Sequence, residues 1–157
     1  MATAFPDRLD IPEALWQAML AHLSACLPEE GCGLLGGPIP VDGAAIAVYI
    51  LTVENELHSP VRFRMPPTAL LAALNTLESR GLDLLAVFHS HPNGPEQPSP
   101  TDCAEFAYPG VLSLIATPEP VEHWRIRAFA IDGVLDPHAP VREVALRRIL
   151  EPAHPHD

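Results

Sequence analysis

Two histidines and an aspartate, His89, His91 and Asp102, lie close together in the sequence, and these residue types bind metal ions. The apolar residues 84–88 come directly before His89 and predict a buried strand. Because side chains alternate between the two faces of a strand, His89 and His91 are expected on the same side at its carboxyl end. Two imidazoles that emerge together indicate a metal site.

Asp102 adds a carboxylate to the two histidines after a proline-rich loop that restricts the path of the chain. Two histidines, one aspartate and an open fourth position are the ligand count of a catalytic zinc ion, since a structural zinc site uses four protein ligands. The sequence therefore predicts zinc-dependent hydrolysis. The same ligand set also suits non-haem iron, so redox chemistry at iron is an alternative.

Structural roles also account for these residues. The segment Ser-Pro-Thr-Asp from Ser99 to Asp102 has the N-cap, first-turn proline and N3 acid of a helix start. A helix N-terminus would fix the direction of Asp102 and favour its negative charge, so capping and metal binding are compatible. His89 and His91 could likewise be histidines that hydrogen-bond to the backbone.

A zinc hydrolase also needs a group that takes the proton from the metal-bound water. Glu29 and Glu30 are the candidates, because they stand at the start of an apolar segment flanked by glycines. The structural alternative is that both are ordinary exposed acids.

The elements that must position these residues follow from apolar periodicity. Helices are predicted over residues 12–27 and 68–80, with Asp10 or Ile11 at the start of the first and Gly81 after the second. Apolar or alternating runs predict strands over residues 29–37, 44–53, 61–65, 84–88, 111–115 and 124–131.

The end of the chain gives weaker signals. Asp132 and Gly133 form a hairpin signal, and residues 141–150 fit either a strand or a helix. Residues 151–157, which contain His154 and His156, are expected to form a disordered tail without a folding signal.

Composition excludes several classes of protein. The 157 residues suffice for one domain, and 20 acidic against 9 basic side chains give a net charge of −11, which opposes nucleic-acid binding. No apolar run approaches the length of a membrane span, so no membrane association is expected. Cys26, Cys32 and Cys103 show no disulfide or zinc spacing, which indicates a reducing cytoplasm. A nucleophilic Cys32 or Cys103 is a further alternative, although both lie among small or apolar residues typical of packing.

Taken together, His89-Ser90-His91, seven residues, Ser99, two residues and Asp102 resemble the signature of the JAMM (MPN+) metallopeptidases. The segment Pro-Glu-Glu-Gly-Cys-Gly-Leu-Leu is similar to the strand that carries the catalytic glutamate in the compact prokaryotic members, which by register is Glu30. The similarity extends from about residue 15 to residue 133. It implies one α/β domain over residues 9–150, a curved mixed β-sheet flanked by helices, of the cytidine deaminase-like type.

The resemblance also implies roles. His89, His91 and Asp102 would bind one zinc ion with a water, Glu30 would activate that water, and Ser99 would hydrogen-bond to the oxyanion of the tetrahedral intermediate. Whether Glu29 could replace Glu30 stays open.

The implied substrates are the flexible carboxyl tails of ubiquitin-like and sulfur-carrier proteins, joined by amide or isopeptide bonds. Residues 61–65 or the backbone near Gly36 are expected to pair with such a tail by strand addition. The alternatives are a non-catalytic scaffold or binding module, and a RadC-like protein, whose DNA role the acidic charge opposes. The oligomeric state stays open, with a homodimer as one possibility.

Overall fold

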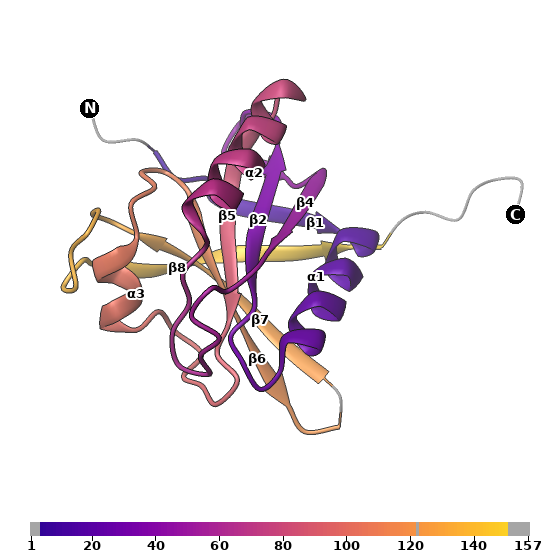
Figure 1. Ribbon diagram of the computed structural model, residues 1–157. Helices are drawn as coiled ribbons and strands as arrows, with labels where there is room; N and C mark the ends of the chain where they lie inside the picture. Colours follow the sequence, from indigo (N-terminus) through magenta and orange to yellow (C-terminus); the bar gives the residue numbers. More distant parts are fainter. Residues whose placement is uncertain (1–3, 122, 151–157) are drawn as a thin grey trace, which may run out of the picture.

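A computed structural model describes residues 4–121 and 123–150 of the chain (Figure 1). The elements follow in the order β1 (Arg8–Pro12), α1 (Glu13–Cys26), β2 (Cys32–Gly37), β3 (Ala44–Ile46), β4 (Tyr49–Val53), α2 (Pro67–Ser79), β5 (Asp83–Ser90), α3 (Pro100–Glu105), β6 (Leu112–Glu119), β7 (His123–Ile131) and β8 (Val141–Ile149). None of the helices in this part of the chain is long and apolar enough to cross a membrane.

The strands form one mixed sheet in the order β3-β1-β8-β7-β6-β5-β2-β4. β5 pairs parallel with β6 and antiparallel with β2, whereas β1 pairs parallel with both β3 and β8. Figure 1 shows that β1 and β8 run across the direction of β2 and β5, so the sheet is strongly twisted. This architecture confirms the expected α/β fold with a curved mixed sheet and flanking helices.

The core lies on both faces of the sheet, and β5 separates its two halves. Phe88 packs in one apolar cluster with Met19 and Leu23 of α1. Its neighbour Val87 packs in a second cluster, which includes residues of α2 and α3 such as Cys103. Since successive strand residues face opposite sides, the continuous apolar run of β5 follows from burial on both faces. The carboxyl end of this strand is therefore held rigidly.

Most of the predicted elements are confirmed, including both long helices and the strands that correspond to β2, β5, β6 and β7. Residues 141–150, whose sequence fitted either a strand or a helix, contain the strand β8. It pairs antiparallel with β7, although residues 132–140 make the connection longer than the predicted two-residue turn. The predicted tail at 151–157 lies outside the described residues.

The start of the chain differs from the prediction. Asp10 does not begin the first helix but lies within β1, where its buried carboxylate accepts hydrogen bonds from Arg8 and Arg147. Pro12 occupies the N-cap position instead. Sequence periodicity missed β1 because the strand is short and runs directly into the helix.

The strand predicted over residues 44–53 is in fact two strands that end up at opposite edges of the sheet. Between them, the amide of Ala47 donates to the carbonyl of Asp10 at 2.9 Å, and the amide of Val48 donates to the carbonyl of Gly36 at 2.8 Å. The chain thus changes partner from β1 to β2 at this point. Apolar character alone does not reveal such a change of partner.

The strand predicted over residues 61–65 is wrong, because this segment belongs to the loop between β4 and α2. Asn55 accounts for the difference: its amide group donates to the carbonyl of Arg62 at 3.0 Å, and its oxygen accepts from the amide of Arg64 at 3.1 Å. A side chain thereby occupies backbone groups that a strand partner would otherwise use.

Gly33 of β2 leaves no room for a side chain. An added Cβ would lie 2.3 Å from the ring of Phe88 and 2.5 Å from the carbonyl oxygen of Leu51. We expect Gly33→Ala to lower the free energy of unfolding by about 1–3 kcal/mol, measured by chemical denaturation. The control is Gly36→Ala, whose Cβ would meet the movable end of Leu77 at 2.4 Å and should cost less. Equal losses would contradict this reading of the packing.

Candidate metal centre

The carboxyl end of β5 is fixed by its two neighbouring strands. In the β2–β5 ladder Cys32 lies opposite His89, and one step further the amide of Ser90 donates to the carbonyl of Gly31 at 3.0 Å. On the other side, the amide of His91 donates to the carbonyl of Ala116 at 2.9 Å. Both histidines therefore leave a backbone that is hydrogen-bonded on both sides, and Glu30 lies just before β2 beside them.

Three side-chain atoms converge at this point. The Nε2 atoms of His89 and His91 are 3.0 Å apart, and the Oδ2 atom of Asp102 lies 3.3 Å from the first and 3.0 Å from the second. Donor atoms at about 2.0–2.1 Å from a tetrahedral zinc ion are about 3.3–3.4 Å from each other. The triangle therefore fits three ligands of a single ion. The predicted proximity of His89 and His91 is confirmed.

Glu30 lies on the same side of the sheet and is buried, with an exposed fraction of 3%. One of its carboxylate oxygens and one ring nitrogen each of His89 and His91 lie within 4.8 Å of one another, so this group could also hold a metal ion. Its Oε1 atom has no hydrogen-bond partner among the described residues. Burial of a carboxylate oxygen without a partner lowers the stability of the folded protein unless a cation or a proton compensates its charge.

Burial raises the pKa of Glu30 from 4.5 to about 7; the nearby Asp102 contributes to this rise, and His91 opposes it. A carboxyl group with a pKa near neutrality can both accept and release a proton. Glu29 is placed differently: it is partly exposed, and its Oε2 atom lies 3.3 Å from Nδ1 of His58. The structure thus separates the two candidate acids, and only Glu30 faces the histidines.

Asp102 and His91 are held by hydrogen bonds to the loop. The Oδ2 atom of Asp102 accepts from the amide of Ser99 at 2.8 Å, and the Oγ atom of Ser99 accepts from the amide of Asp102 at 3.0 Å. This is the predicted capping box at the start of α3. His91 Nδ1 donates to the carbonyl of Pro95 at 2.6 Å, which leaves Nε2 as the lone-pair atom that faces the site.

The charges of the site follow from these contacts. Burial raises the pKa of Asp102, but the adjacent imidazoles of His89 and His91 and the backbone amide of Ser99 outweigh it and hold that pKa well below its usual range. Burial lowers the pKa of His89, which keeps this imidazole neutral. An ionised carboxylate and a neutral imidazole are the forms that bind a metal ion.

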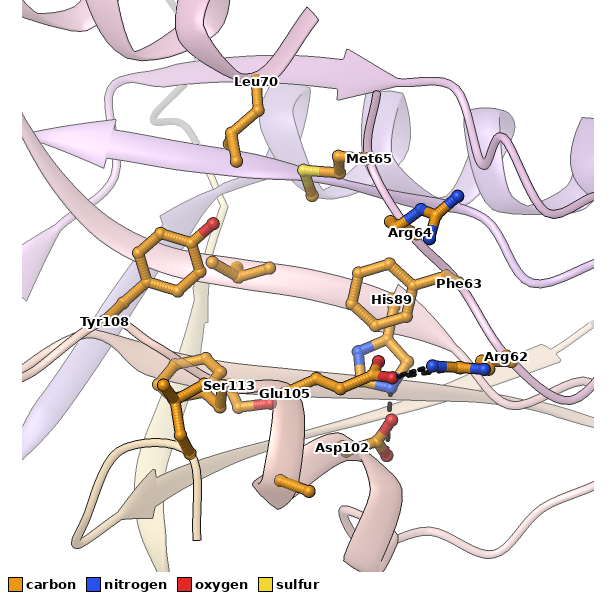
Figure 2. Close-up of a pocket in the computed structure, with 14 residues that line it drawn as sticks. Arg62, Phe63, Arg64, Met65, Leu70, His89, Asp102, Glu105, Tyr108 and Ser113 are labelled. Carbon is orange, nitrogen blue, oxygen red and sulfur yellow. Dashed lines mark hydrogen bonds and ion pairs between the residues drawn. The ribbon is translucent and has the colours of Figure 1, made fainter. Parts of the chain in front are cut away.

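A cavity of about 440 Å³ opens beside His89 and Asp102 (Figure 2). Its wall is largely apolar and comes from the loop before α2, from α2 and from the segment after α3; it includes Phe63, Met65, Leu70, Phe106 and Tyr108. At the rim, Arg62 Nε donates to Glu105 at 3.1 Å. The cavity gives His89 and Asp102 an apolar neighbourhood on one side.

The structure therefore brings together Glu30, His89, His91 and Asp102, with Ser99 hydrogen-bonded to Asp102. The Oγ atom of Ser99 acts as an acceptor in this bond, which leaves its hydroxyl hydrogen available. A residue that the sequence did not single out is Phe63, which stacks on His89 with ring centroids 4.4 Å apart. In the sequence, the only sign of such a role was an aromatic residue between two arginines.

The thiols do not have the properties of a nucleophile. Burial raises the pKa of Cys32 to about 12, and burial also raises the pKa of Cys103. A reactive thiol requires a lowered pKa, because the thiolate is the nucleophile. The raised pKa values of Cys32 and Cys103 therefore oppose the alternative of a cysteine protease.

The comparison with known families now identifies the class of protein. The family of prokaryotic homologs of the JAB domain matches residues 12–127, so the chain belongs to this family. This finding confirms the resemblance seen in the sequence.

Several named proteins are similar to this chain. A probable TtuB-protein conjugate cleaving protease from Thermus thermophilus is 41% identical over 98 residues, which cover 62% of each chain. A desampylase from Haloferax volcanii is 32% identical over 59% of this chain and 65% of its own length. The match therefore spans a little under two thirds of these two relatives. A CysO-cysteine peptidase from Mycobacterium tuberculosis is 28% identical over 77% of this chain and 82% of its own.

Solved structures show the same fold. A solution structure of a protein from Desulfitobacterium hafniense superposes with a TM-score of 0.75 at 28% identity, covering 95% of this chain and 98% of the other. A solution structure of a protein from Salinibacter ruber gives a TM-score of 0.66 at 27% identity, with 93% and 94% covered.

The raised pKa of Glu30 predicts a pH-dependent stability of the metal-free protein. Folded Glu30 keeps a proton that the unfolded chain releases between about pH 4.5 and 7, so stability falls as pH rises through this window. Glu30→Gln cannot ionise and should be more stable than wild type at about pH 8, by up to about 3 kcal/mol, with no such gain at about pH 4.

Denaturation of both metal-free proteins across this pH range measures the difference. Glu29→Gln is the matched control, because it removes the neighbouring, partly exposed carboxylate. A gain of Glu30→Gln that does not depend on pH would contradict the assignment of the effect to ionisation.

Proposed function

We propose that the protein is a zinc-dependent metallopeptidase that hydrolyses amide or isopeptide bonds at the carboxyl tails of ubiquitin-like or sulfur-carrier proteins. The observation that carries the proposal is the convergence of His89 Nε2, His91 Nε2 and Asp102 Oδ2 within 3.0–3.3 Å of one another, beside the buried carboxylate of Glu30. His89, His91 and Asp102 would hold one zinc ion, because these three atoms have nearly the separations of three ligands around one tetrahedral zinc ion.

The relatives support the substrate class. Their names describe cleavage of TtuB–protein conjugates, desampylation and cleavage of CysO–cysteine. The shared chemistry is hydrolysis at the end of a small carrier protein, and we extend it to this chain. Nucleic acid is not a substrate in this proposal, since the chain carries a net charge of −11. We also place the protein in the cytoplasm, which suits its free thiols at Cys26, Cys32 and Cys103.

When bound, zinc supplies Lewis acidity: it lowers the pKa of water and polarises a carbonyl group. Glu30 then serves as the general base, because its Oε1 atom is free to accept a proton from the attacking water. The same carboxyl group passes that proton to the nitrogen of the leaving amine. Its surroundings raise the pKa toward neutrality in the metal-free protein, and bound zinc would lower it again.

Ser99 stabilises the oxyanion. Its Oγ atom accepts a hydrogen bond from the amide of Asp102, and this bond fixes the hydroxyl beside the ligand carboxylate. The hydroxyl hydrogen is left to donate to the developing negative charge on the substrate oxygen. Ser99 therefore acts as helix cap and as oxyanion donor with one oxygen atom.

We propose that the substrate tail binds in another way than by the strand pairing that the sequence suggested. Residues 61–65 form no strand, and Gly36 is already paired with Tyr49 of β4 and with Leu84 of β5. The apolar cavity beside His89 is a better receptor for a part of the tail. In this proposal the protein recognises the tail through side-chain contacts in the cavity and not through backbone pairing.

Glu30→Gln should keep zinc and lose cleavage. The amide has nearly the shape of the carboxylate but cannot accept the proton, so the rate should fall by about 10²–10⁴-fold. The measurement is cleavage of a fusion in which a peptide follows the terminal glycines of a ubiquitin-like protein, together with the zinc content of each variant. Glu29→Gln is the matched control and should cleave at close to the wild-type rate.

Full activity of Glu30→Gln would remove this residue from the mechanism. Chelation should abolish cleavage by the wild type, and added zinc should restore it. If the zinc-loaded wild type binds ubiquitin-like fusions but cleaves none of them, the non-catalytic binding module replaces the enzyme as the account of this chain.

A further inference from the structure

The two histidines of the site are supported in different ways. His91 donates from Nδ1 to the carbonyl of Pro95 at 2.6 Å, whereas Nδ1 of His89 is buried and has no hydrogen-bond partner among the described residues. A histidine that ligates a metal nearly always donates its second N–H group to a carboxylate, carbonyl or water, and this bond fixes the orientation of the ring. Some other contact must therefore orient the ring of His89.

The contact is a stacked aromatic ring. Phe63 lies against His89 with ring centroids 4.4 Å apart and an interplanar angle of 28°. Figure 2 shows the Phe63 ring over the imidazole, on the side of the cavity. His91 meets the same imidazole edge-on, at 4.8 Å and 64°. Two rings at different angles restrict rotation about the side-chain bonds of His89.

The backbone on either side of Phe63 is held by one buried side chain, Asn55. Asn55 donates from Nδ2 to the carbonyl of Arg62 at 3.0 Å and accepts at Oδ1 from the amide of Arg64 at 3.1 Å. These are the residues on either side of Phe63, so the amide group clamps the backbone around the ring. Asn55 is only 6% exposed, which shields these bonds from water.

The same clamp reaches the general base. Nδ2 of Asn55 also donates to the carbonyl of Glu30 at 3.0 Å. The backbone of Glu30 and the segment that carries Phe63 are therefore tied to one amide group. A shift of the loop before α2 would displace both the ring that orients His89 and the residue that moves the proton.

We propose that Phe63 is a positioning residue, which orients the metal ligand His89 by ring stacking, and that Asn55 locks Phe63 in place. This inference rests on the proposed zinc site. It assigns a role to the loop between β4 and α2, residues 54–66, as the support of one ligand. The stacking takes the place of a hydrogen bond that Nδ1 of His89 makes with none of the residues in the described ranges 4–121 and 123–150.

A purely packing role for Phe63 predicts a different outcome. Packing alone would lower the stability of the metal-free protein and leave its affinity for zinc unchanged. Positioning lowers the affinity for zinc, because the unbound protein must spend free energy to order the ligand before it binds. Zinc affinity and metal-free stability therefore distinguish the two roles.

The test compares Phe63→Leu with Phe63→Tyr and with Leu70→Ala, each in the full chain. Leu70 lines the same cavity from α2, across from His89 in Figure 2, so it controls for the loss of apolar wall. The measurements are the dissociation constant for zinc, by competition with a chelator, and the melting temperature of each metal-free protein.

Phe63→Leu should weaken zinc binding by about 10–100-fold, the usual effect of removing an outer contact of a metal ligand. Phe63→Tyr keeps the ring and should restore binding to near the wild-type value, and Leu70→Ala should leave it unchanged. Asn55→Asp, which replaces the donating amide by a carboxylate, should weaken zinc binding in the same direction as Phe63→Leu.

Wild-type zinc affinity in Phe63→Leu would overturn the inference while leaving the proposed function intact. An equal loss in Leu70→Ala and Phe63→Leu would also overturn it, because the effect would then belong to the cavity wall. Unchanged affinity in Asn55→Asp would remove Asn55 from the account. A wild type that binds no zinc would overturn the proposed function and this inference together.

Discussion

The pairing of β5 with β2 on one side and β6 on the other is the constraint on which the rest of the structure depends. Burial on both faces makes β5 apolar until His89, and the ladders continue past it, through Ser90 to the amide of His91. The backbone of both histidines is thereby fixed without any contribution from a metal. Because β2 runs antiparallel to β5, Glu30, which lies two residues before β2, arrives at the same place from a distant part of the sequence.

The site places charged and polar side chains in the interior of the protein. Two carboxylates and two imidazoles lie together, with exposed fractions of 3% for Glu30, 2% for His89 and 4% for His91. Burial of such groups is unfavourable unless hydrogen bonds or a cation compensate. Capping at Ser99 and the carbonyl of Pro95 satisfy Asp102 and His91, but Oε1 of Glu30 and Nδ1 of His89 have no partner in the described part of the chain. A cation bound beside Glu30 would compensate the burial of its carboxylate.

The sequence suggested the local features of the proposed site more directly than the long-range ones. His89, His91 and Asp102 could be recognised because a strand, a short loop and a helix cap relate them within one segment. Glu30 could not be distinguished from Glu29 by residue type, and register against a known family favoured Glu30. The structure places Glu30 beside His89 and His91 and places Glu29 beside His58. Strand pairing between distant segments is not encoded in a local pattern.

The loop before α2 shows where local patterns fail. Residues 61–65 alternate apolar and basic side chains as an edge strand does, yet Asn55 captures the backbone of Arg62 and Arg64. Side-chain hydrogen bonds to the backbone compete with strand pairing, and periodicity does not register them. The contact between Phe63 and His89 depends on these hydrogen bonds of Asn55, so the sequence pattern alone could not predict it.

The most direct test of the account is a crystal structure of the zinc-loaded protein with anomalous scattering recorded at the zinc edge. The account predicts one zinc ion with Nε2 of His89, Nε2 of His91 and a carboxylate oxygen of Asp102 at about 2.0–2.2 Å, and Glu30 outside the coordination shell. A zinc ion bound by Glu30 in place of Asp102, or bound away from His89 and His91, would contradict it.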